Sequence, residues 1–194
     1  MSMTITFKNT KKFEQFLSKA HMEILRQEVH KATATNLGIV QDAIVRRIIQ
    51  RGKKADNSPL TLALKPHTDI PLMDTGQMKN AVEAELQDSF NGTVGFLKDQ
   101  KTSHGMKMSV VVPGLEKGYT IKLTAAMRRA LFAKMRAAGI AEQAPGKKST
   151  TGGVLRVPPR PFITPVFHSK HIKNKLQKNW KNAVREAYRR MGAL

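Results

Sequence analysis

The sequence predicts an α+β fold, in which long N-terminal and C-terminal helices pack on a small, mostly antiparallel sheet, with a further helix inserted near residues 123–138. Apolar residues recur at helical spacing toward both ends of the 194-residue chain. Between them, residues 82–97 alternate with a period of two around an Asn-Gly pair, which is typical of a β-hairpin. We find no internal repeat, and we predict a single domain over residues 1–194.

The N-terminal helical segment is predicted over residues 10–51. Its apolar residues form two stripes at spacings of three and four: Phe13, Phe16, Leu17, Ala20 and Ile24, then Leu37, Val40, Ile44 and Ile48. Residues 33–36 between the stripes are rich in weak helix formers, so a kink, a break and a continuous helix all stay open there. We expect Gly52 to end the helix and residues 52–73 to form a long loop punctuated by prolines.

The sheet is predicted within residues 80–121. Val82, Ala84 and Leu86 alternate with polar neighbours, and Asn91-Gly92 favours a hairpin turn because both residues tolerate positive φ. A third strand is predicted over residues 108–112, where a valine run ends at a Pro-Gly pair. Residues 154–157 are a candidate last strand.

Two more helices are expected. The inserted helix over residues 123–138 is followed by a basic loop over residues 144–153. A stiff proline-rich segment, residues 158–162, then leads into a C-terminal helix over residues 163–191. The apolar stripe of that helix is made by Ile172, Leu176, Trp180, Ala183, Ala187 and Tyr188. Its spacing predicts that Trp180 belongs to the core.

The charge is high and unevenly distributed. The chain has 34 Lys and Arg residues against 14 Asp and Glu residues, a net charge of +20. Residues 147–194 alone carry 12 of these basic residues and a single Glu. Such a field attracts polyanions, namely nucleic acid, an anionic membrane surface or an acidic protein. Candidate contacts to DNA or an acidic partner are Lys173, Lys178, Lys181, Arg185 and Arg189. The structural alternative is a solvated face over a packed apolar stripe.

Several function classes are excluded or disfavoured. The chain has no cysteine, which excludes disulfides, thiolate metal sites and cysteine nucleophiles. No apolar stretch has the length of a signal-peptide core or a membrane helix, so we expect a cytoplasmic setting. His168 and His171 lie three residues apart, but no third ligand is near them in sequence, and we expect two solvated histidines. We predict no catalytic, cofactor or metal site.

The tripeptide Asp74-Thr75-Gly76 allows two interpretations. Aspartic proteases present such a loop, and a single copy would require a homodimer. The alternative is a turn before a short helix, in which Asp74 accepts from backbone N–H groups. Further along, Arg160 is either a surface charge or a clamp on a neighbouring carboxylate, and Phe162 is a core or interface anchor.

Taken in order, five segments resemble a known family: residues 58–60 (SPL), 71–78 (PLMDTGQM), 94–96 (VGF), 127–132 (MRRALF) and 157–162 (VPPRPF). The order is similar to that in the neck and tail-completion proteins of long-tailed bacteriophages, notably the phage Mu-type virion morphogenesis group. The Leu-x-Asp-Thr-Gly turn and the Pro-Arg-Pro-Phe entry to the last helix carry most of the resemblance, which spans nearly the whole chain.

The resemblance implies a structural virion protein rather than an enzyme. It implies a ring, commonly a hexamer, between the head connector and the tail, around the DNA channel. The implied partners are other copies of the chain, a connector or head-closure protein, the tail tube or terminator, and sheath proteins. It also implies a structural role for Asp74, Thr75 and Gly76. The implied location is the neck of the virion, after assembly in the host bacterial cytoplasm, with no membrane and no cofactor.

Two alternatives stay open beside this interpretation. The high positive charge and the basic C-terminal helix also fit a cytoplasmic protein that binds nucleic acid without sequence specificity. An aspartic protease dimer built on Asp74 is the least favoured, because three residues are a weak signal.

Overall fold

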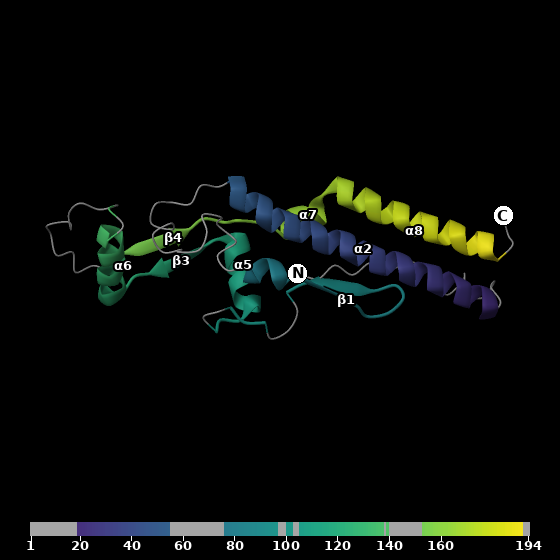
Figure 1. Ribbon diagram of the computed structural model, residues 1–194, viewed down its shortest axis with the longest axis horizontal. Helices are drawn as coiled ribbons and strands as arrows, with labels where there is room; N and C mark the ends of the chain where they lie inside the picture. Colours follow the sequence, from purple (N-terminus) through teal and green to yellow (C-terminus); the bar gives the residue numbers. More distant parts are fainter. Residues whose placement is uncertain are drawn as a thin grey trace. The chain divides into compact units, whose positions relative to one another are not determined.

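The computed structural model describes residues 19–54, 76–96, 100–102, 105–137, 139 and 153–191, with the backbone alone for 51–54. The fold is α+β, as predicted (Figure 1). The chain divides into two compact units. The helix-pair unit comprises Met1–Arg46, Ala81–Leu97 and Ile163–Leu194, and the ribbon unit comprises Arg47–Asn80 and Lys98–Phe162. The single domain stays a prediction, because compact units of this size can belong to one domain or to two.

Helix α2 (Lys19–Lys54) is continuous, which answers the question left open at residues 33–36. It runs through Gly52, so the predicted helix end there is wrong, and residues 52–54 are helical rather than part of a loop. An isolated helical glycine costs only about 1 kcal/mol, which does not terminate a long packed helix. The predicted helical residues 10–18 and the predicted loop residues 55–73 lie outside the described residues.

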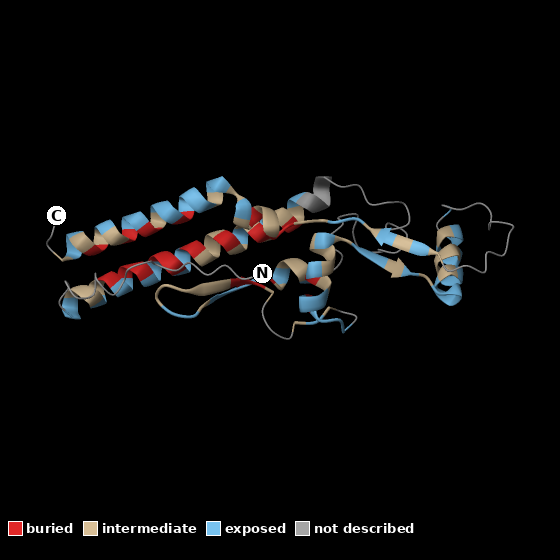
Figure 2. Cartoon of the chain, turned by 180° about the vertical axis from the view of Figure 1, so that it is seen from behind, coloured by how far each residue is buried: buried red, intermediate tan, exposed pale blue. Residues whose placement is uncertain are grey.

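The core of the helix-pair unit lies between α2 and α8 (Lys170–Arg190), which run side by side (Figures 1 and 2). Its central cluster of buried side chains comprises Leu25, Val29, Trp180 and Ala187. Four of the six predicted stripe residues of the C-terminal helix are buried: Leu176, Trp180, Ala183 and Ala187. The predicted core position of Trp180 is therefore confirmed.

Strands β1 (Glu83–Leu86) and β2 (Gly92–Gly95) form an antiparallel hairpin, with Ala84 opposite Val94 and Glu85 opposite Thr93. The turn differs from the predicted Asn-Gly turn, because five residues connect the strands. Asp88 holds this loop: its Oδ1 accepts from the backbone N–H groups of Phe90 (2.7 Å) and Asn91 (2.8 Å). A side-chain hydrogen bond from Asn91, with these backbone donors, lowers the pKa of Asp88.

Gly92 is required for close packing, not for a positive φ. A Cβ atom at this position would lie 2.4 Å from Leu37 Cδ1 and 2.9 Å from the Glu85 carbonyl oxygen. The hairpin therefore approaches α2 directly over Leu37, and a side chain at position 92 would separate them.

The C-terminal helical region is two helices, not the single helix predicted over residues 163–191. Helix α7 (Thr164–His168) ends at Ser169, whose extended backbone interrupts the helix before α8 begins. The Ser169 hydroxyl accepts from the Ile172 N–H, and such N-cap bonds stabilise a new helix start. Pro165 lies near the start of α7, where proline is tolerated.

The ribbon unit contains α4 (Gln77–Asn80), α5 (Met108–Lys117), β3 (Tyr119–Lys122), α6 (Ala125–Ala137) and β4 (Val154–Val157). The predicted strand at residues 108–112 is wrong, because these residues begin α5. Met108 and Val112 are buried, Val111 and Leu115 are half-buried, and the four positions share one helix face. Burial of this face outweighs the β-propensity of the valines and the cost of Pro113 inside the helix.

The inserted helix and the last strand are confirmed as α6 and β4. β4 pairs antiparallel with β3, so the described strands form two separate two-stranded sheets instead of one sheet. Gly118 links α5 to β3 with φ +73, and a Cβ there would lie 2.8 Å from the Val157 carbonyl oxygen. Of the predicted basic loop, residues 144–152 lie outside the described residues.

Two glycine substitutions test the hairpin packing. Gly92→Ala should destabilise the protein by about 1–3 kcal/mol, because its Cβ overlaps Leu37 and the Glu85 backbone. Gly38→Ala is the matched control in α2, where nothing lies within 4 Å of the added Cβ. It should stabilise the protein by about 0.5–1 kcal/mol. Urea unfolding of both variants measures the difference, and equal effects of the two substitutions would contradict the packing described.

Candidate nucleic-acid interface

Four cations lie in one line on the exposed side of α8. Lys178, Lys181, Arg185 and Arg189 follow each other at spacings of three, four and four, and all are exposed. This spacing places them opposite the buried stripe of Leu176, Trp180, Ala183 and Ala187. We call these four residues the cationic stripe. It extends over about 16 Å of helix.

Lys173 is not aligned with the other four predicted contacts. It is exposed, but it lies three residues before Leu176 and seven before Trp180, at the edge of the buried face. Lys170 lies eleven residues before Lys181, about three helical turns, and therefore extends the cationic stripe in the N-terminal direction. Of the five contacts predicted from sequence, Lys173 therefore lies beside the cationic stripe, and Lys170, which was not predicted, lies in line with it.

The orientation of α8 is fixed by polar contacts with α2. The Asn36 side chain, which is only 3% exposed, donates to the Leu176 carbonyl oxygen at 3.3 Å and accepts from Asn179 Nδ2 at 2.8 Å. A buried amide is costly unless its hydrogen bonds are made. A rotation or shift of α8 would break both bonds, so Asn36 specifies which face of α8 points outward.

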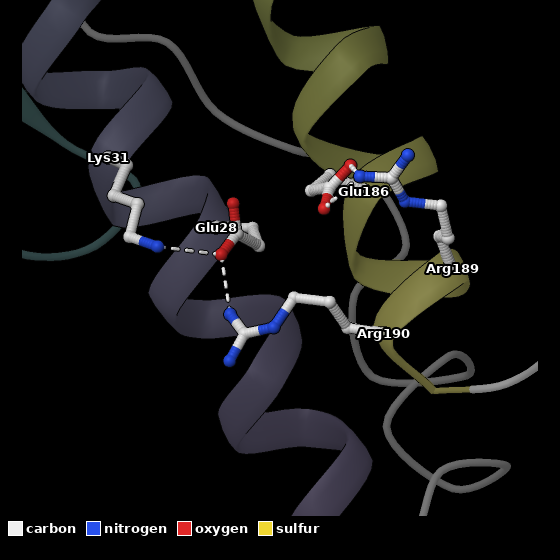
Figure 3. A network of polar contacts seen from close by, with 5 residues as sticks. All are labelled: Glu28, Lys31, Glu186, Arg189 and Arg190. Carbon is white, nitrogen blue, oxygen red and sulfur yellow. Dashed lines mark hydrogen bonds and ion pairs between the residues drawn. The ribbon is translucent and has the colours of Figure 1, made fainter.

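A second polar contact joins the two helices near the N-terminal end of α2 (Figure 3). Glu28 is buried, and its Oε1 lies 2.8 Å from Lys31 Nζ on the same helix and 2.6 Å from Arg190 Nη1 on α8. The hydrogen bond from Lys31 lowers the pKa of Glu28, and the contact with Arg190 lowers it further. Burial raises this pKa, but the net result is a pKa below the usual value. Arg190 is therefore a structural cation and not part of the cationic stripe.

The cationic stripe is only weakly compensated by nearby carboxylates. Glu186 accepts from Arg189 at 2.8 Å one turn away, in a pair that is exposed to solvent (Figure 3). Lys178, Lys181 and Arg185 form no ion pair with a carboxylate of the described residues. The sequence does not predict the contacts of Glu28, Asn36 and Asn179, because a polar residue inside a helical pattern does not indicate which helix packs against it.

The proline-rich segment packs along α5 within the ribbon unit. Phe162 is fully buried, which confirms it as an anchor, and its N–H donates to the Glu116 carboxylate. Arg160 is half-buried, and its N–H donates to the Leu115 carbonyl oxygen at 2.7 Å. A carboxylate therefore lies beside this segment, but it binds the backbone of Phe162.

The other predicted positions are only partly described. Asp74 and Thr75 lie outside the described residues. Gly76 has φ +74, and its carbonyl oxygen accepts from the Asn80 N–H at 3.0 Å across α4. A glycine turn before a short helix agrees with the structural interpretation of the Asp-Thr-Gly tripeptide, while a role for the Asp74 carboxylate stays a prediction.

Other kinds of site find little support in the described part of the chain. His168 ends α7 and His171 belongs to α8, so they do not share one helix, and the described residues hold no cluster of three or more metal-binding side chains. A cavity of about 30 Å³ beside Trp180 and Phe90 has the size of a water molecule, and a groove of about 320 Å³ along Lys31, Asn179 and Glu186 is shallow and open to solvent. None of the described helices is long and apolar enough to span a bilayer.

Searches against protein-family models, curated proteins and solved structures found no match to this chain. The resemblance to phage neck proteins therefore rests on the order of the sequence motifs, and the function is argued from those motifs and the geometry above.

The Glu28 contact predicts an acid-sensitive helix pair. The pKa of Glu28 is lowered in the fold, so its contribution to stability is present above pH 4.5 and is lost as the pH falls through the folded-state value. Glu28→Gln should cost about 1 kcal/mol at pH 7, a modest value because Lys31 and Arg190 are both more than a third exposed. It should also flatten the acid limb of a stability–pH profile measured by urea unfolding. Glu186→Gln, in an exposed pair within one helix, is the control and should keep the acid limb of the parent.

Proposed function

We propose that this chain is a structural subunit of a bacteriophage virion, a neck or tail-completion protein that forms a closed ring, commonly of six copies, around the DNA channel. The ring would join the head connector or head-closure protein to the tail tube or terminator and the sheath. It would be assembled in the host bacterial cytoplasm and retained in the virion. The order of the sequence motifs supports the class of protein.

The observation that carries the proposal is the cationic stripe. Its side chains point away from the packed face of α8, and three of its four cations have no carboxylate partner among the described residues. A row of exposed cations over about 16 Å suits the phosphate backbone of DNA, which binds such side chains through charge and without reading sequence. A ring that surrounds a genome could hold it through this kind of unspecific attraction.

Self-assembly tests the proposal directly. We expect the purified full chain to form a single closed oligomer at micromolar concentration, with a mass that is a small integer multiple of the 21.6 kDa subunit. Native mass spectrometry and light scattering measure that mass. A chain that stays monomeric at high concentration, with or without phage connector protein, would contradict the proposal.

A second candidate function, unspecific binding of nucleic acid by a free cytoplasmic protein, is favoured by the same stripe. The slope of log affinity for duplex DNA against log salt is negative. Either function predicts that Lys181→Ala/Arg185→Ala makes this slope shallower by about 2. Lys101→Ala/Lys117→Ala removes two exposed cations outside the stripe and should leave the slope unchanged. An equal loss of slope in both variants would show that the stripe is not the binding surface. Tight DNA binding by a persistent monomer would favour the second candidate.

A further inference from the structure

Among its described residues, the segment formed by β3, α6 and β4 has no core of its own. We call its described residues, 119–137 and 153–157, the arm. No residue of these three elements is buried (Figure 2). A two-stranded ribbon or a 13-residue helix is only marginally stable in water without packing against another element. The arm is thus the part of the described chain that most requires a partner.

The exposed apolar side chains also indicate that the arm binds a partner. The large hydrophobic residues exposed in the described chain are Met106, Val110, Tyr119, Met127 and Val154, and all belong to the ribbon unit. Three of the five lie in the arm. The register of the ribbon gathers Tyr119, Ile121, Leu155 and Val157 on one face, which is apolar and at most half-buried. Exposed apolar faces of this kind are typical of interaction sites.

The opposite face of the ribbon is cationic and exposed. It carries Thr120, Lys122, Val154 and Arg156. Lys122 and Arg156 are diagonal neighbours across the two strands, about 7–8 Å apart. Six Lys or Arg residues and no carboxylate occur among the described residues of the arm. A partner for this surface should therefore be acidic.

The chain itself has a complementary acidic surface. Residues 81–96, the hairpin of the helix-pair unit, contain three carboxylates and no Lys or Arg. Ala84 and Val94 share the face of the hairpin that includes Gly92 and packs over Leu37, so Glu83 and Glu85 lie together on the other face, where both are exposed. Two residues along a strand are about 7 Å apart. The two carboxylates thus match the spacing of Lys122 and Arg156.

We infer that the arm docks on a second copy of this chain, with Lys122 and Arg156 against Glu83 and Glu85 of the neighbouring hairpin. The contact is heterologous, since it joins two different surfaces, and such contacts close into rings when the rotation between copies permits. The inference rests on the proposed function, because it names the surfaces through which the ring subunits associate.

Charge reversal tests the contact in the full chain. Glu83→Lys/Glu85→Lys and Lys122→Glu/Arg156→Glu should each raise the concentration for half-assembly at least about tenfold, because like charges then face each other. An equimolar mixture of the two variants should regain assembly, since every contact between unlike variants, in either order, again pairs opposite charges. Glu23→Lys/Asp42→Lys reverses two exposed carboxylates elsewhere in the helix-pair unit and should assemble like the parent. Sedimentation velocity measures all four samples.

A cross-link provides a second measurement that does not depend on charge. The chain has no cysteine, so Glu85→Cys on one copy and Arg156→Cys on another place a single thiol on each side of the contact. A bismaleimide with a spacer about as long as a Glu–Arg pair should link the mixture into a mixed dimer that neither variant forms alone, whereas a direct disulfide would need Cα atoms within about 7 Å. If the parent forms rings while the charge-reversed variants assemble normally and no dimer forms, the inference is wrong and the proposed function stands. A parent that stays monomeric overturns both. A double-cysteine chain whose two thiols are linked by the same reagent within one copy at high dilution also overturns the inference.

Discussion

The contact between α2 and α8 determines what the helix-pair unit can present to a partner. The apolar stripe determines which face of α8 is buried, but apolar contacts alone define the register between two helices less sharply, because one leucine or alanine contact can replace another. Asn36 removes this freedom, since its amide is buried and meets specific partners on α8. Glu28 adds a second such point with Arg190. The apolar stripe and the buried polar groups together fix the rotation of α8, and the rotation places the cationic stripe outward.

Charge and packing are distributed differently in the two units. The described part of the helix-pair unit leaves no large apolar side chain exposed, while most of its ionic side chains are exposed. The ribbon unit exposes large apolar residues beside cations and holds few carboxylates among its described residues. Mutual repulsion among these cations opposes compact packing within one chain, whereas contact with an acidic surface of a neighbour removes it. In the assembly that we propose, the same charge distribution would favour contacts between subunits.

Patterns that depend on local periodicity were predictable from the sequence. The stripes around Ile44 and Trp180 and the alternation of residues 82–86 each depend on neighbours a few residues away, and all three match the structure. The strand predicted at residues 108–112 failed because four apolar positions also fit a helical face, and tertiary burial decided between the two. The new helix start after Ser169 is marked by one hydroxyl cap. The need for glycine at position 92 arises because Leu37, far away in the sequence, packs against it. The cations of α8 could be listed from sequence, but their alignment needed the buried face as a reference.

The central claim is that identical copies close into a ring with the cationic stripe toward the DNA channel. A cryo-EM reconstruction of the assembled full chain, at a resolution that traces α8, tests it most directly. The account predicts a closed ring in which Lys178, Lys181 and Arg185 line the central passage. A reconstruction in which these residues lie on the outer rim, or are buried between copies, would contradict it.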